Sequence, residues 1–198
     1  MDVIVKIFPE PKIDKTAVLK YAGCKEADEG TKKLLNDCIY EAKFAFNYRV
    51  AYMHLPITVS GDEIDFSFFR TTSKSLVKAH DGCDGSVLFA ASVGFGIDRL
   101  IKKYSLTSPS KALMFQALGT ERIEALCNLF SKDIAKELKR KTKRRVSPGY
   151  GDISLELQKN FFEVLCCPRY LSLSLSENML ITPTKSVTAF IGVKNEFP

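Results

Sequence analysis

The sequence has few residues of the types that carry metal-binding and nucleophilic chemistry. Its 198 residues include six cysteines, two histidines and no tryptophan. His80 and Cys83 are spaced like metal ligands, but no second ligand pair completes a tetrahedral zinc site. With His54 as the only other imidazole, a histidine-based nucleophilic triad has few candidate parts. We therefore expect no metal site and assign no catalytic residue.

The cysteines are too few for a disulfide scaffold at this length. Cys166 and Cys167 are adjacent, so they lack the two-residue spacing with which paired thiols bind zinc or exchange a disulfide. The other four are dispersed along the chain, as unpaired thiols usually are. We expect reduced, structural cysteines and assign no chemistry to the adjacent pair.

Long apolar runs and low-complexity segments are also missing. No apolar run approaches the ~20 residues that span a bilayer, and the N-terminus lacks the pattern of a secretory signal. With 45% hydrophobic and 26% charged residues, 8 prolines and 11 glycines, the composition argues against disorder. No linker divides the chain. We therefore expect one domain over residues 1–198, in the cytoplasm, without a membrane partner.

Hydrophobic periodicity predicts several helices and strands. Helical spacing predicts helices over 13–21, 31–46, 73–80, 97–104, 108–141 and 154–165. Alternating or continuous apolar residues predict strands over 48–59, 64–68, 86–92, 171–175 and 187–193. Because hairpin signals such as Ser60-Gly61-Asp62 outnumber βαβ signals, we predict an α+β fold. Its sheet is expected to be mixed, largely antiparallel and twisted, with helices packed on it.

Glycines interrupt two of these segments. Gly119 lies inside the long helix, where it eases a close approach or marks a kink. Gly94-Phe95-Gly96 stands between a strand and a helix, like a dinucleotide-binding loop, but the third glycine of that motif is absent. We interpret this second segment as an ordinary turn.

The net charge of +6 is concentrated in one segment. Residues 136–145 carry seven lysines and arginines against the single acid Glu137, and the rest of the chain has as many cations as anions. Such a cluster binds nucleic acid or a membrane, attracts an acidic partner, or forms the solvated end of a helix. It lacks the interleaved aromatic residues that stack on bases, so nucleic-acid binding ranks low among these interpretations.

The loop after the basic segment combines several ligand-binding features. Within residues 145–152, Arg145 supplies a guanidinium and Tyr150 supplies an aromatic ring. Two glycines in the same loop leave backbone amides available to a ligand. This combination suits a small ligand with a carboxylate and a flat or cationic part. Two alternatives stay open: Arg145 only caps the preceding helix, or Tyr150 only fills the core.

Two blocks in this half of the chain read RVSPGYGDISLELQKNFFEVL and LSLSENMLITPTKSVTAFIGV. In this order they resemble the activation domain of cobalamin-dependent methionine synthase, the S-adenosylmethionine-binding module at the C-terminus of that enzyme. The resemblance covers most of the chain from about Cys83 onward. It implies the fold of that domain and the binding of the same ligand.

The resemblance also implies individual binding residues. Arg145 and Tyr150 match the motif Arg-x-x-x-Gly-Tyr, in which the arginine holds the methionyl carboxylate and the tyrosine lines the pocket near the sulfonium. Glu124, more than Glu121, matches the acid that faces the ligand's amino group, and Asp14 is a candidate for a further aspartate. The expected ligand-binding set is Arg145, Gly149, Tyr150, Glu124, Pro148 and Gly151.

No Asp-x-His-x-x-Gly motif, which ligates cobalamin in the full enzyme, occurs in the sequence. The resemblance therefore implies a stand-alone activation protein that docks on a separate cobalamin-bearing synthase subunit and supports reductive methylation of cob(II)alamin. S-adenosylmethionine is its expected cofactor, with cobalamin only on the partner. Lys139 and Lys143 are expected to dock an acidic, flavodoxin-like electron donor. Alternatives are an independent methyltransferase and a nucleic-acid-binding or scaffold protein.

Overall fold

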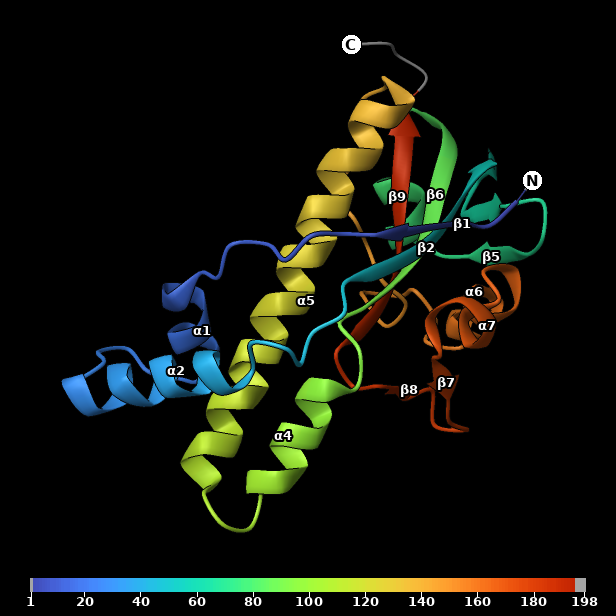
Figure 1. The fold of residues 1–198 in the computed structure, drawn as a ribbon. Helices are drawn as coiled ribbons and strands as arrows, with labels where there is room; N and C mark the ends of the chain where they lie inside the picture. The colour runs from blue at the N-terminus through green and yellow to red at the C-terminus, as the bar shows by residue number, and fades with distance from the viewer. Residues whose placement is uncertain (1, 195–198) are drawn as a thin grey trace.

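The structure is a computed structural model that describes residues 2–194. Its main sheet has the order β1-β2-β6-β9, formed by Ile4–Ile7, Arg49–Pro56, Cys83–Ser92 and Ser186–Lys194 (Figure 1). Two small sheets accompany it: β3 (Thr58–Ser60), β4 (Glu63–Asp65) and β5 (Arg70–Thr72), and the pair β7 (Ser174–Leu175) and β8 (Ile181–Thr182). All strand pairs among the described residues are antiparallel, which confirms the predicted α+β fold with a largely antiparallel sheet.

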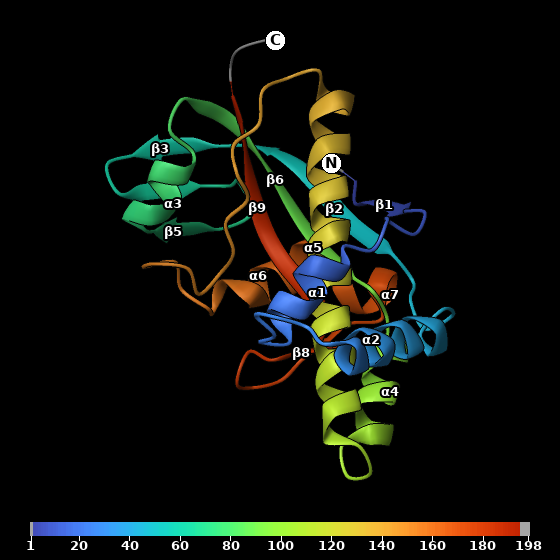
Figure 2. The same cartoon turned by 90° about the vertical axis from the view of Figure 1, so that its left-hand side faces the viewer.

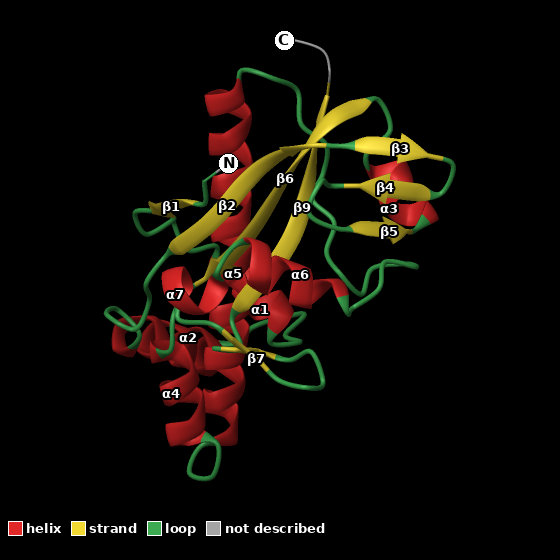
Figure 3. Cartoon of the chain, turned by 90° about the vertical axis from the view of Figure 1, so that its right-hand side faces the viewer, coloured by secondary structure: helices red, strands yellow, loops and turns green. Residues whose placement is uncertain are grey.

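Helices cover both faces of the main sheet. They are α1 (Lys15–Tyr21), α2 (Glu29–Glu41), α3 (Lys74–Ala79), α4 (Gly96–Tyr104), α5 (Pro109–Leu138), α6 (Leu157–Val164) and α7 (Cys167–Leu171). Figures 2 and 3 view the sheet from opposite sides and show α5 on one face, with α6 and α7 on the other. None of the helices in residues 2–194 is both long and apolar enough to cross a membrane.

Strand β6 shows why the sheet is covered twice. Val87, Phe89 and Ala91 point to a core shared with α1, α2, α4 and α5. The intervening Leu88 and Ala90 belong to a second core with α3, α6 and α7. Because alternate side chains of a strand point to opposite faces, a continuous apolar run fits a strand buried on both sides.

Helix α5 is continuous through Gly119. A Cβ atom at that glycine would lie 3.0 Å from Lys185 Cε and 3.1 Å from Ile97 Cγ1, so the glycine permits a close approach and marks no kink. The helix ends at Leu138, three residues before the predicted end, because Lys139 has the left-handed φ of 50°.

The basic segment leaves the helix and runs along β9. Lys143 N donates to Gly192 O at 2.8 Å, and Val146 and Phe190 exchange backbone hydrogen bonds of 3.0 and 2.8 Å. The interpretation of this segment as a solvated helix end is therefore wrong for residues 140–145. This extended course places Arg145 beside the middle of α5.

Other element boundaries differ from the sequence prediction. The helix predicted over 31–46 ends at Glu41, and the following turn leaves Phe44 92% exposed while Phe46 stacks on Tyr48. The strand predicted over 48–59 divides at Ile57 between two sheets. Residues 167–171 are helical, so the strand expected over 171–175 is reduced to Ser174–Leu175. The edge strand β1 was not predicted.

Candidate ligand-binding site

A cavity of about 670 Å³ lies between the middle of α5 and the segment that follows the basic run. The helix and the segment each contribute side chains to its wall. The lining residues are Glu124, Asn128, Arg144, Arg145, Val146, Ser147 and Tyr150. The structure thus brings together three of the residues singled out from the sequence, Glu124, Arg145 and Tyr150.

The Arg145 guanidinium is held by two side chains of α5. Its Nη2 donates to Glu124 Oε2 at 2.5 Å, and its Nη1 donates to Asn128 Oδ1 at 2.7 Å. Arg145 therefore does not cap the basic helix. A guanidinium has five N–H donors, so it retains donors for a ligand carboxylate. The wall presents a cation and an anion side by side, which is complementary to the two charged groups of an α-amino acid.

The loop 147–151 presents Tyr150 to the cavity. Gly149 has a φ of 87° and donates its N–H to Ile153 O at 2.8 Å, while Tyr150 N donates to Ser147 O at 3.1 Å. The Tyr150 side chain is 65% exposed, so the interpretation of Tyr150 as a core residue is wrong. Pro148, which is buried, and the two glycines shape the loop but do not line the cavity. A ligand contact by Pro148, Gly149 or Gly151 stays a prediction.

Asp152 fastens this loop to the start of α3. Its Oδ1 accepts hydrogen bonds from Ser73 Oγ at 2.6 Å and Ser75 N at 3.0 Å, and its Oδ2 accepts one from Lys74 N at 2.9 Å. These hydrogen bonds, chiefly those from Ser73 and Ser75, hold the pKa of Asp152 well below its usual range. Gly151 lies so close to α3 that a Cβ atom would meet Ser75 Oγ at 2.5 Å.

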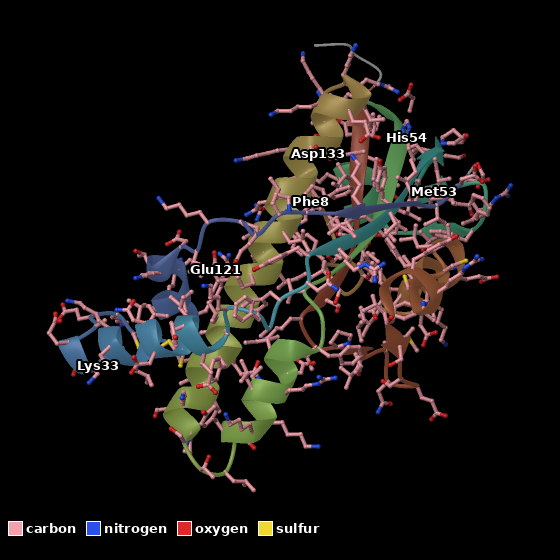
Figure 4. The ribbon with its side chains drawn as sticks, in the orientation of Figure 1. Phe8, Lys33, Met53, His54, Glu121 and Asp133 are labelled. Carbon is pink, nitrogen blue, oxygen red and sulfur yellow. The ribbon has the colours of Figure 1, made fainter. Side chains whose placement is uncertain are left out.

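Glu121 and Glu124 have different roles. Glu121 is buried and accepts hydrogen bonds from Arg122 Nε at 2.5 Å and from Arg122 Nη2 at 2.7 Å. Arg122 also donates to the carbonyls of Pro11 and Lys12, so this pair fixes the N-terminal segment on α5. Figure 4 labels Glu121 on α5. Only Glu124, half-exposed at the cavity, is available to a ligand.

The N-terminal segment brings α1 close to the Arg145–Glu124 pair. Tyr21 ends α1, and its pKa is raised by burial and by the negative charges of Glu124 and Glu121, against the opposing effect of Arg145. Asp14 does not line the cavity, because its carboxylate caps α1 by accepting Ala17 N at 3.0 Å. Its expected role as a ligand contact stays a prediction.

The sequence alone assigns no role to two residues that lie near the site, Asn128 and Tyr21. Asn128 lies four residues after Glu124, and this helical spacing places both on one face of α5, so a helical wheel would have found it. Tyr21 is brought in only by the packing of α1 against α5, and nothing in the local sequence indicates this contact.

Carboxylates neutralise part of the basic segment. Arg140 pairs with Asp84, Lys143 Nζ lies 3.9 Å from Asp81 Oδ2, and Arg145 pairs with Glu124. Lys139 is exposed at the end of α5, whereas Lys143 is half-buried on the segment beside β9. The two lysines proposed for partner docking therefore lie on different segments.

Neither histidine lines the cavity. His80 is buried, with Nδ1 2.9 Å from Leu76 O and Nε2 2.9 Å from Ser86 Oγ, and its burial lowers its pKa. Burial also lowers the pKa of His54. The described part of the chain contains no cluster of three or more side chains suited to hold a metal ion. Cys38, Cys127 and Cys167 are buried, and Cys166 is exposed.

No protein-family model and no curated protein matches the sequence. Among solved structures, the chain is similar to one described as the crystal structure of the MetH reactivation domain bound to AdoHcy. The TM-score is 0.76 at 13% sequence identity, over 100% of this chain and 80% of that chain. The chain therefore has the α+β fold of the MetH reactivation domain.

Proposed function

We propose that this chain binds S-adenosylmethionine in the cavity between α5 and residues 144–150, and that it supports reductive methylation of cobalamin on a separate protein. One observation carries the proposal. Arg145 and Glu124 place opposite charges on one cavity wall, in a fold shared with a domain whose structure is described as bound to AdoHcy.

The amino-acid end of the ligand fits this pair by exchange of partners. The ligand carboxylate takes the free N–H groups of Arg145, and its ammonium group takes Glu124 Oε2, which now accepts from Arg145. Because the zwitterion brings one charge of each sign, neither side chain is left unpaired when the 2.5 Å contact opens. The exposed ring of Tyr150 lies where it can contact the sulfonium through a cation–π interaction.

The chemical contribution of the chain is orientation. Bound S-adenosylmethionine would supply the methyl group to the partner's cobalamin, with one electron from an external donor, and S-adenosylhomocysteine would be left in the cavity. Arg145, Glu124 and Tyr150 hold the ligand at three points, which makes the transfer a proximity effect. No proton moves in this step, so no general base is needed.

An independent methyltransferase is less well supported. Methylation of a neutral nucleophile calls for a base near the acceptor. Among the described residues, Glu124 is the only carboxylate that lines the cavity, and Arg145 is hydrogen-bonded to this carboxylate. Nucleic-acid binding also loses support, because three cations of the basic segment face carboxylates of the same chain.

The experiment compares two neighbouring arginines that both line the cavity. Arg145→Gln removes the guanidinium held by Glu124 and Asn128, whereas Arg144→Gln removes an exposed one. A lost charge-assisted hydrogen bond costs ~1.5–3 kcal/mol, so calorimetry should show a loss of affinity of about tenfold or more for Arg145→Gln only. Equal losses in both variants would mean that the ligand meets diffuse charge and not a built site.

A further inference from the structure

A second hollow, of about 320 Å³, lies where β2 begins and β6 ends. Its walls are residues 44–47 and Arg49, Leu171-Ser172 at the end of α7, and Ser92, Gly94-Phe95-Gly96 and Arg99 around the start of α4. None of the residues that line the Arg145 cavity lines this one. The hollow includes the Gly94-Phe95-Gly96 segment, which the proposed function leaves without a role.

The charged residues that line this hollow are both arginines. Arg49 and Arg99 line it, and no aspartate or glutamate in the described part of the chain does. Within residues 2–194 neither arginine forms an ion pair, and the Nε atom of Arg49 is buried without a hydrogen-bond partner. Arg49 is half-buried and has no anionic partner among the described residues, so an anion in the hollow would pair with its charge.

The backbone adds further donors. Phe95 occupies the N-cap of α4 and makes no side-chain cap, so the first amides of this helix have no capping side chain at that position. Asp98, the acid in the first turn, accepts Thr184 N and Thr184 Oγ1, both at 2.7 Å, and does not line the hollow. Packing alone explains the glycine at position 96, because a Cβ atom there would lie 2.2 Å from Ala45 O.

We propose that this hollow binds the phosphate group of a small molecule, with Arg49 and Arg99 as its charged donors. Two guanidinium groups favour phosphate over a carboxylate, because phosphate has more acceptor oxygens and a larger charge for two planar donor groups. The exposed rings of Phe44 and Phe95 lie at the hollow, where they can contact an apolar or planar part of the same ligand. Inorganic phosphate and a nucleotide share this chemistry.

Thermal unfolding and calorimetry of the full chain in phosphate-free buffer test the site. Inorganic phosphate and adenosine monophosphate should raise the melting temperature more than sodium chloride of equal ionic strength. Arg99→Gln, a change at an exposed residue, should weaken phosphate binding about tenfold. Arg49→Met should abolish the phosphate effect while melting no lower than the wild type, because it removes a buried Nε donor that has no hydrogen-bond partner.

Arg70→Gln, at an exposed arginine of β5, is the matched control and should leave phosphate binding unchanged. Arg145→Gln should also keep the phosphate response, which separates this site from the proposed S-adenosylmethionine site. A stronger response to adenosine monophosphate would identify a nucleotide ligand, and equal responses would identify free phosphate. A missing phosphate response, or one unchanged in Arg49→Met and Arg99→Gln, would overturn the proposal.

Discussion

At the scale of single residues, two glutamate–arginine pairs on or beside α5 show how burial decides what a charge can do. The Glu121–Arg122 pair is buried and joins the N-terminal segment to the helix. The Glu124–Arg145 pair has the same chemistry, but it lines a cavity and is partly exposed to solvent. The first pair is structural, and the second can exchange its partners for those of a ligand.

Asn128 should act on the ligand through Arg145. Asn128→Ala removes the acceptor 2.7 Å from Arg145 Nη1, so the guanidinium is held less firmly in the cavity. We expect S-adenosylmethionine affinity to fall by about 0.5–1.5 kcal/mol, less than for Arg145→Gln. Calorimetry would measure the loss. The control is Asn36→Ala on α2, which removes an exposed hydrogen-bond acceptor of Lys15. An equal loss of affinity in Asn36→Ala would contradict the role of Asn128.

At the scale of elements, Glu41 ties the end of α2 to α4 and α5. Its carboxylate contacts Lys111 Nζ at 2.6 Å and Lys103 Nζ at 3.0 Å, and it accepts from the Tyr104 hydroxyl at 2.8 Å. The hydrogen bond from Lys111 is the largest cause that lowers the pKa of Glu41 to about 2. These three helices share one hydrophobic core with α1, and α5 also forms one wall of the cavity.

The lowered pKa predicts a dependence of stability on pH. Because the folded pKa of about 2 lies below the ordinary value of 4.5, the contribution of Glu41 is present above about pH 4.5 and is lost as the pH falls toward 2. Glu41→Gln should lower the melting temperature at pH 7 and reduce its fall in acid. Glu29→Gln, at an exposed acid of the same helix, should change neither. If the melting temperature of Glu41→Gln falls in acid as much as that of the wild type, the assignment of this pH dependence to Glu41 is contradicted.

The sequence predicts elements better than it predicts their ends and contacts. Helix α5 and strand β6 were predicted because their apolar residues follow a clear helical period or form a continuous run. The end of α2 was missed, because Phe46 keeps the helical spacing although it packs on Tyr48 after the turn. Strand β1 was missed because only four residues pair, at the edge of the sheet.

Some residues of the candidate site could also be predicted from the sequence, whereas their tertiary contacts could not. Arg145, Tyr150 and Glu124 were found because a local motif and a helical segment carry them. Asp152 could not be assigned, since its partners at the start of α3 lie more than seventy residues away in the sequence. Likewise, the neutralisation of the basic segment by Asp81 and Asp84 depends on tertiary packing, which no local pattern encodes.

At the scale of the whole molecule, the excess of six positive charges lies in a segment that continues into the cavity wall. A cationic surface beside the ligand would speed encounter with an acidic electron donor. If the proposed function holds, this chain restores turnover to a cobalamin-dependent synthase that lacks its own activation domain. The restored rate should fall as salt rises to physiological strength, where the Debye length is about 8 Å.

The substitutions Lys139→Glu and Lys143→Glu, which reverse the charge, should remove that salt dependence. Arg145→Gln should instead abolish the restored activity at every salt concentration. Steady-state assays across ionic strength would measure both effects. A restored rate that changes neither with salt concentration nor with substitution of the two lysines would contradict a docking role for the basic segment. It would not bear on the ligand site.

The central claim is that this chain binds S-adenosylmethionine, and calorimetric titration of the purified protein tests it most directly. We predict one site per chain. Ligand at about 100 times its dissociation constant should add about 2.7 kcal/mol to the free energy of unfolding. The absence of binding at millimolar S-adenosylmethionine and S-adenosylhomocysteine would contradict the proposed function.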